Sequence, residues 1–71
     1  MNTVEVFKTN VQQKKDADKL LKYLSKQFPC YKINFDLDDC DKILRVEGET
    51  LLPDKIIDLL LAKGHECHML D

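Results

Sequence analysis

Residues 31–48 limit the possible folds of this chain more than any other segment. They read YKINFDLDDCDKILRVEG, in which apolar and polar residues alternate, an acidic run intervenes, and the alternation resumes. A period of two is typical of a strand with one buried face. The segment therefore predicts two strands joined by an acidic turn, with Gly48 ending the second. The residues expected to face inward are Tyr31, Ile33, Phe35, Leu37, Leu44 and Val46.

Helical periodicity flanks this pair of strands on both sides. Between residues 14 and 27 the apolar positions recur at the spacing of one helix face, and Pro29 ends the pattern. A second helix is expected to begin at Pro53 and to stop at Gly64. The core-facing residues predicted for the first helix are Ala17, Leu20, Leu21, Leu24 and Phe28. Those predicted for the second are Ile56, Ile57, Leu60 and Leu61.

A first strand is predicted at Thr3–Thr9. Its alternation favours Val4 and Val6 on the inward face. Phe7 then falls on the opposite face, unless a bulge near Asn10 shifts the phase.

A short last strand, His65–Leu70, completes a β-α-β-β-α-β order. Right-handed crossovers then predict one α+β domain over residues 1–71, a ferredoxin-like fold with a four-stranded antiparallel sheet and two helices on one face. Three connections would share one end of this domain. They are the loop Val11–Asp16, the turn Asp38–Lys42 and the junction Gly64–His65.

Composition narrows the functional classes. The longest unbroken apolar run is four residues, far below the ~20 that a membrane span needs, and no signal-peptide pattern opens the chain. Three widely spaced cysteines, Cys30, Cys40 and Cys67, favour reduced thiols. We therefore expect a cytoplasmic protein that does not bind membranes. Nucleic-acid binding is not expected either, because no aromatic-rich strand is present for base stacking.

The chain resembles the heavy-metal-associated (HMA) domain, the fold of small copper chaperones. The resemblance rests on INFDL in the second strand, VEG closing the third, and LLPDKIIDLLLAKGH across the second helix. The family carries a Met-x-Cys-x-x-Cys metal motif after its first strand. Here Val11 stands at the Met position, and Gln13 and Asp16 stand at the two Cys positions. Because copper(I) needs soft thiolate ligands, the resemblance implies the scaffold without the family's metal site.

Three other groups of side chains could form sites. His65, Cys67 and His68 are a dense group of metal-capable side chains, and Cys40 could approach His65. They leave open an alternative function, a metal carrier with non-standard ligands. The acidic run 36–41 lacks the glycine and distal glutamate of a calcium loop. No triad-like arrangement points to an enzyme, and neither a metal nor a cofactor is predicted. A weaker alternative is a regulatory domain that binds a small anion at the first helix.

Charge is unevenly distributed and suggests a partner. Residues 1–35 carry seven lysines and three acids, whereas residues 36–71 carry four basic and ten acidic residues. We therefore predict a non-enzymatic interaction module that binds an acidic protein through the first helix and its loop. The residues predicted to contact the partner are Gln13, Lys14, Lys15, Lys19 and Lys22, in a row that continues to Lys26. One alternative is salt-sensitive self-association. Another is a partner surface formed by Phe7 and Ile43 on the open side of the sheet together with Leu59 at the edge of the second helix.

Overall fold

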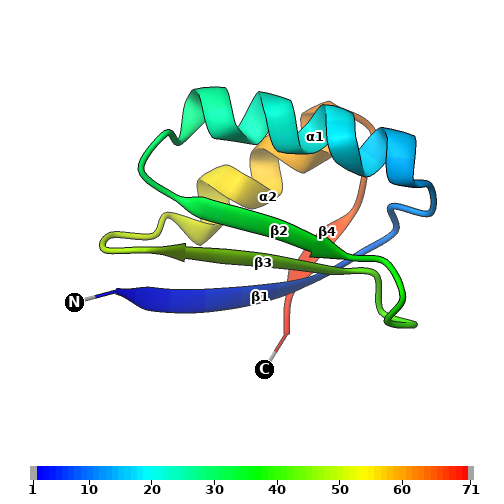
Figure 1. Ribbon diagram of the computed structural model, residues 1–71, viewed down its shortest axis with the longest axis horizontal. Coiled ribbons are helices and arrows are strands. Elements are labelled where there is room, and N and C mark those ends of the chain that lie inside the picture. Colours follow the sequence, from blue (N-terminus) through cyan, green and yellow to red (C-terminus); the bar gives the residue numbers. More distant parts are fainter. Residues whose placement is uncertain (1, 71) are drawn as a thin grey trace.

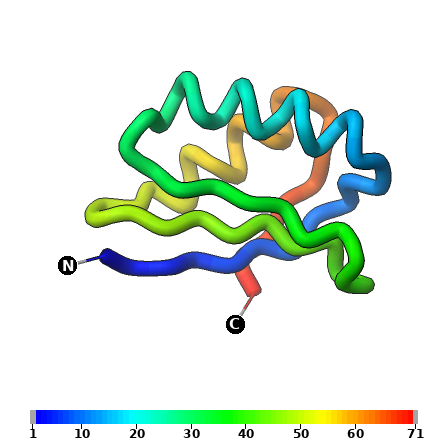
Figure 2. Tube along the Cα trace, in the orientation of Figure 1, coloured from blue at the N-terminus to red at the C-terminus, as the bar shows by residue number. Residues whose placement is uncertain are grey.

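A computed structural model describes residues 2–70 and confirms the α+β architecture. The chain forms a four-stranded antiparallel sheet in the order β2-β3-β1-β4. Both helices lie on the same side of this sheet, and the other side is uncovered (Figures 1 and 2). The elements are β1 (Thr3–Thr9), α1 (Lys14–Gln27), β2 (Lys32–Asp36), β3 (Ile43–Gly48), α2 (Pro53–Ala62) and β4 (Cys67–Met69).

The core fills the space between the sheet and the two helices. Its main cluster consists of Phe7, Leu24, Leu44, Val46, Ile56, Leu60 and Cys67. A second, smaller cluster lies beside the loop that leads into α1 and consists of Val11, Ala17 and Leu20. Phe35 packs against both clusters and joins them. The sequence predicts Leu20 in a single core with Leu24, whereas the structure places these two residues in different clusters.

The prediction for the inward face of β1 is wrong. Phe7 is fully buried, whereas Val4 is 50% exposed. Phe7 pairs with Leu44 in a continuous register, so no bulge shifts the strand. Because strand side chains alternate, Phe7 and Thr9 face the helices, and Val4 and Val6 face the uncovered side. An aromatic side chain removes more apolar area from water than a valine does, and this favours the observed phase.

The inward face of α2 also differs from the prediction at one residue. Ile56 and Leu60 are fully buried, as predicted, but Leu61 is 63% exposed. Successive helix residues are about 100° apart, so Leu61 lies well beyond the buried stripe centred on Ile56 and Leu60. The half-buried Leu59 takes its place against the core. The helix begins at Pro53, as predicted.

The two edges of the sheet differ. β4 has only three residues, and the N–H of Leu70 just beyond it donates to the carbonyl of Val6 at 2.8 Å. Cys67 at the start of β4 is only 4% exposed, so little of the β4 edge is accessible there. β2, at the other edge, has five residues of which none is fully buried. Across residues 2–70, no helix is both long enough and apolar enough to cross a bilayer.

Candidate functional site

One end of the domain brings together the three connections predicted to meet there. The N–H of Thr9, the last residue of β1, donates to the carbonyls of Asp41 and Lys42 in the acidic turn, each at 3.2 Å. The side chain of the next residue, Asn10, accepts the N–H of Glu66 at 2.9 Å. The end of β1 is thus bonded to the acidic turn and to the segment before β4.

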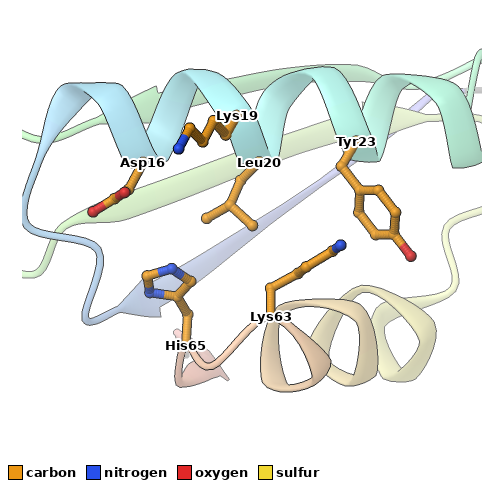
Figure 3. Close-up of a pocket in the computed structure, with 6 residues that line it drawn as sticks. All are labelled: Asp16, Lys19, Leu20, Tyr23, Lys63 and His65. Atoms are coloured by element: carbon orange, nitrogen blue, oxygen red, sulfur yellow. The ribbon is translucent and has the colours of Figure 1, made fainter.

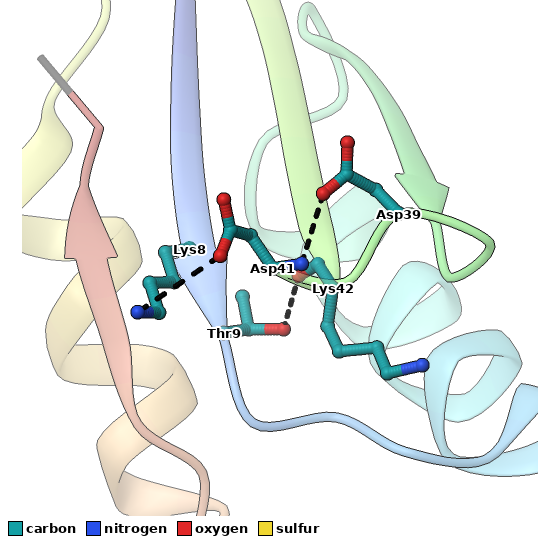
Figure 4. A network of polar contacts seen from close by, with 5 residues as sticks. All are labelled: Lys8, Thr9, Asp39, Asp41 and Lys42. Atoms are coloured by element: carbon teal, nitrogen blue, oxygen red, sulfur yellow. Dashed lines mark hydrogen bonds and ion pairs between the residues drawn. The ribbon is translucent and has the colours of Figure 1, made fainter.

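Thr9 is bonded through its side chain to the acidic turn and to the loop before α1, and Figure 4 shows the bond to Lys42. Its hydroxyl donates to the carbonyl of Lys42 at 2.6 Å and accepts the N–H of Val11 at 3.3 Å. The residue is 7% exposed, so these bonds are shielded from water. Thr9 therefore links the acidic turn to the loop that leads into α1.

One aspartate of the acidic turn stabilises the turn itself. The Asp39 carboxylate accepts the N–H of Asp41 at 2.9 Å, and Lys42 adopts a φ of 51°. Aspartate forms such local bonds readily, and they stabilise tight turns. Ligand atoms of Asp39, Cys40 and Asp41 lie within 4.8 Å of one another, and between residues 2 and 70 no other group of three metal-capable side chains is this close. Two of these residues are exposed, and the third is half-buried.

The loop Val11–Asp16 is packed at one end and exposed in the middle. Val11 is buried against Ala17 and Leu20. Gln13 caps α1 only through its backbone, because its carbonyl accepts the N–H groups of Asp16 and Ala17 at 3.1 Å each. Its exposed side chain makes no capping bond. Gln13 and Asp16 therefore give this loop an amide and a carboxylate and no thiol.

The cysteines and histidines lie in different environments. Cys67 is part of the main core, and burial raises the pKa of its thiol from 9.0 to about 12. A thiol this difficult to ionise is a poor metal ligand at neutral pH. His68 is exposed and His65 is half-buried. Cys30 and Cys40 are free and exposed.

The lysines predicted to contact a partner lie on the surface of α1. All of those in the helix are exposed, namely Lys14, Lys15, Lys19, Lys22 and Lys26. Residues 15, 19, 22 and 26 are spaced four, three and four apart, so they form one stripe on the side away from the core. We refer to these four residues as the lysine stripe. In residues 2–70, Lys8 and Asp41, 3.9 Å apart, form the one ion pair, so no stripe lysine forms an ion pair there.

A groove beside the stripe involves residues that the sequence analysis missed. This groove, of about 410 Å³, lies between α1 and the end of α2 (Figure 3). The Lys63 ammonium lies 4.2 Å from the centre of the Tyr23 ring in a cation–π contact. Leu20 points into the groove between the two helices. The sequence carries no signal for this pairing, because Tyr23 and Lys63 belong to different helices whose relative positions depend on the sheet. The groove is lined by Asp16, Lys19, Leu20, Tyr23, Lys63 and His65.

Comparisons with protein-family models, with curated proteins and with solved structures each found no match for this chain.

Proposed function

We propose that this chain is a ferredoxin-like domain of HMA type that has lost its metal-binding loop. The strand order β2-β3-β1-β4 and the position of both helices on one side support the ferredoxin-like assignment. The resemblance of the segments around β2, β3 and α2 supports the relationship to HMA domains. The free thiols are consistent with action in the cytosol, where disulfides are rare.

We infer that the domain acts by binding a protein rather than by catalysis, and that its partner presents an acidic surface. The lysine stripe carries this proposal: its four ammonium groups are exposed, they lie on one side of α1, and none is in an ion pair within residues 2–70. Like charges arranged along one helix repel each other and raise the free energy of the isolated domain. A carboxylate-rich partner would relieve this repulsion.

The stripe would act mainly on the rate of encounter. Exposed charges steer a complementary partner over roughly 8–10 Å at physiological ionic strength, and salt screens them beyond that distance. Such charges generally alter the association rate more than the dissociation rate. The Val11–Asp16 loop lies at the N-terminal end of the stripe, so Gln13 and Lys14 would contact the edge of the partner.

The test is charge reversal with a matched control. The double variant Lys15→Glu, Lys19→Glu changes two stripe residues, and Arg45→Glu, Lys55→Glu makes the same change in net charge at exposed positions elsewhere. Partners captured from the cell of origin are identified by mass spectrometry, and association rates are then measured over a salt series. We expect the stripe variant to slow association and the control variant to leave it nearly unchanged. Partners that bind both variants equally would contradict the proposal.

The same uneven distribution of charge leads to an alternative, which is self-association of the domain. The lysine stripe of one copy would then meet the acidic turn of another, a contact that is strongest at low salt. Sedimentation velocity at low and high salt separates the two cases. A dimer that dissociates as salt rises, and that Lys15→Glu, Lys19→Glu abolishes, would favour self-association over a separate acidic partner.

A further inference from the structure

The outer edge of the sheet at β2 has backbone groups without a strand to pair with. Leu44 of β3 is opposite Phe7 on one side and opposite Phe35 on the other. The N–H of Thr9 donates to the carbonyl of Lys42, the residue just before β3. This hydrogen-bonded Thr9–Lys42 pair lies two residues along the strands from the Phe7–Leu44 pair. Hydrogen-bonded pairs alternate in antiparallel sheets, so Leu44 directs its backbone bonds to β1. Phe35, and by the same alternation Ile33, therefore direct their N–H and C=O groups to the outer edge.

A groove lies directly beside this edge. It is an open hollow of about 610 Å³ between α1 and β2, lined in part by Leu21, Ser25 and Ile33. Lys22 and Lys26 also line it, and both belong to the lysine stripe. The groove therefore combines an apolar floor with two cationic groups, next to the free backbone groups of β2.

We propose that β2 accepts an extended acidic segment of the partner as a fifth strand of the sheet. The inference rests on the proposed acidic partner and specifies the conformation in which that partner binds. The backbone of the segment would pair with Ile33 and Phe35. Every second side chain of the segment would face the helix side. Among these, one apolar side chain would lie on Leu21 in the groove, and acidic side chains on the same face would lie near Lys22 and Lys26.

The chemistry of the β2 edge and its groove favours an extended acidic segment as the ligand. Strand addition supplies affinity through main-chain bonds and specificity through pockets for alternate side chains, and β2 offers both. A helical ligand satisfies its own backbone and would leave Ile33 and Phe35 unpaired. The two lysines favour carboxylates over neutral or basic side chains. The β4 edge is a poorer acceptor, because it is only three residues long and Cys67 within it is buried.

The test uses a synthetic probe and hydrogen exchange. The probe is an acetylated eight-residue peptide with glutamate, valine, glutamate and glutamate at its odd positions and threonine at its even positions, so that valine and the glutamates share one strand face. Its binding is followed by amide-resolved NMR. At about 90% occupancy, exchange proceeds only from the free tenth of the protein, so we expect the Ile33 and Phe35 amides to exchange roughly tenfold more slowly. The Met69 amide on β4 should keep its rate. A control peptide with alternate amides N-methylated has the same charge but cannot pair along that edge, and it should lose this protection.

Two glutamate substitutions in the last turns of α1 provide matched protein variants. Ser25→Glu adds a carboxylate inside the groove, whereas Gln27→Glu adds one close by at a residue that does not line it. Both residues are exposed, so neither change disturbs the core. The repulsion between two like charges about 4 Å apart in water is roughly 1.7 RT, so Ser25→Glu should weaken peptide binding by about fivefold. Gln27→Glu should weaken it by less than about twofold.

The outcomes separate this inference from the proposed function. Peptide binding that perturbs the lysine stripe without slowing exchange at Ile33 and Phe35 would overturn strand addition and leave the acidic partner in place. Equal binding of the N-methylated control would overturn it as well. Absence of binding at a concentration on the order of 1 mM would also overturn strand addition. Failure of the proposed function would give a different result: native partners would bind the Lys15→Glu, Lys19→Glu variant as tightly as they bind the unchanged protein.

Discussion

Replacing Thr9 by valine should separate the end of β1 from the loop before α1. Valine has nearly the shape of threonine but no hydroxyl, so the change removes the bonds to the Val11 N–H and the Lys42 carbonyl. The carbonyl keeps the Thr9 N–H as a donor, whereas the buried Val11 N–H is left without a partner. An unsatisfied buried donor costs about 1–3 kcal/mol, and a typical intramolecular bond contributes about 1 kcal/mol. We therefore expect Thr9→Val to lower the free energy of unfolding by about 2 kcal/mol.

Urea denaturation measures this loss, and Thr3→Val is the matched control. The Thr3 hydroxyl also donates to a backbone carbonyl, that of Gly48 at 3.3 Å, but Thr3 is exposed and water can replace the bond. Its loss should cost less than about 0.5 kcal/mol. Hydrogen exchange gives a local readout, since the Val11 amide should exchange faster in Thr9→Val. Equal losses in the two variants, or an unchanged Val11 exchange rate, would refute the assignment of Thr9 as the link between turn and loop.

Four further predictions concern the core, the reactivity of the cysteine thiols, the pKa of the Cys67 thiol and copper binding. Leu24→Ala and Ile56→Ala should each lower the free energy of unfolding by about 2–5 kcal/mol, and losses below about 0.5 kcal/mol at both would contradict the observed packing. In the native protein, a thiol reagent should modify Cys30 and Cys40 and leave Cys67 unmodified until urea is added. Folding raises the pKa of the Cys67 thiol from 9.0 to about 12, so the native state holds this proton more tightly than the unfolded state does, and stability should fall as pH rises from 9 towards 12. Cys67→Ala should reduce that alkaline slope, and an unchanged slope would argue against the shift. Finally, the protein should retain no copper(I) against a strong chelator with its thiols reduced, because the loop before α1 offers no sulfur ligand. Stoichiometric retention would show that other residues form a copper site.

Local patterns predicted the elements well and their orientation less well. Pro29 and Pro53 restrict the backbone through local sterics, whereas Gly64 permits the φ of 86° that follows the end of α2. Both helices lie within the limits that these residues set. The face of β1 could not be predicted in the same way. Val4 and Val6 alternate with Phe7, so either set could have been buried, and only the packing of the sheet against both helices decides between them.

The predictions for the candidate site show the same difference between local patterns and tertiary packing. The exposure of the stripe lysines on α1 followed from helical periodicity alone, although their contact with a partner stays a prediction. The alternative surface of Phe7, Ile43 and Leu59 is wrong for Phe7, which is fully buried, and Ile43 is only 9% exposed. The two grooves beside α1 could not be predicted, because each combines residues from segments far apart in the chain.

The unequal edges of the sheet set how far strand addition can proceed. A protein with two open edges can join its β2 to the β4 of the next copy, and that head-to-tail contact repeats without closing, as in a fibre. Here β4 has three residues and its Cys67 is covered, so a copy seated on β2 would find no comparable edge to extend from. Growth by this route therefore stops after one added copy. The domain can therefore keep one edge open to a ligand strand without offering a template for open-ended polymerisation.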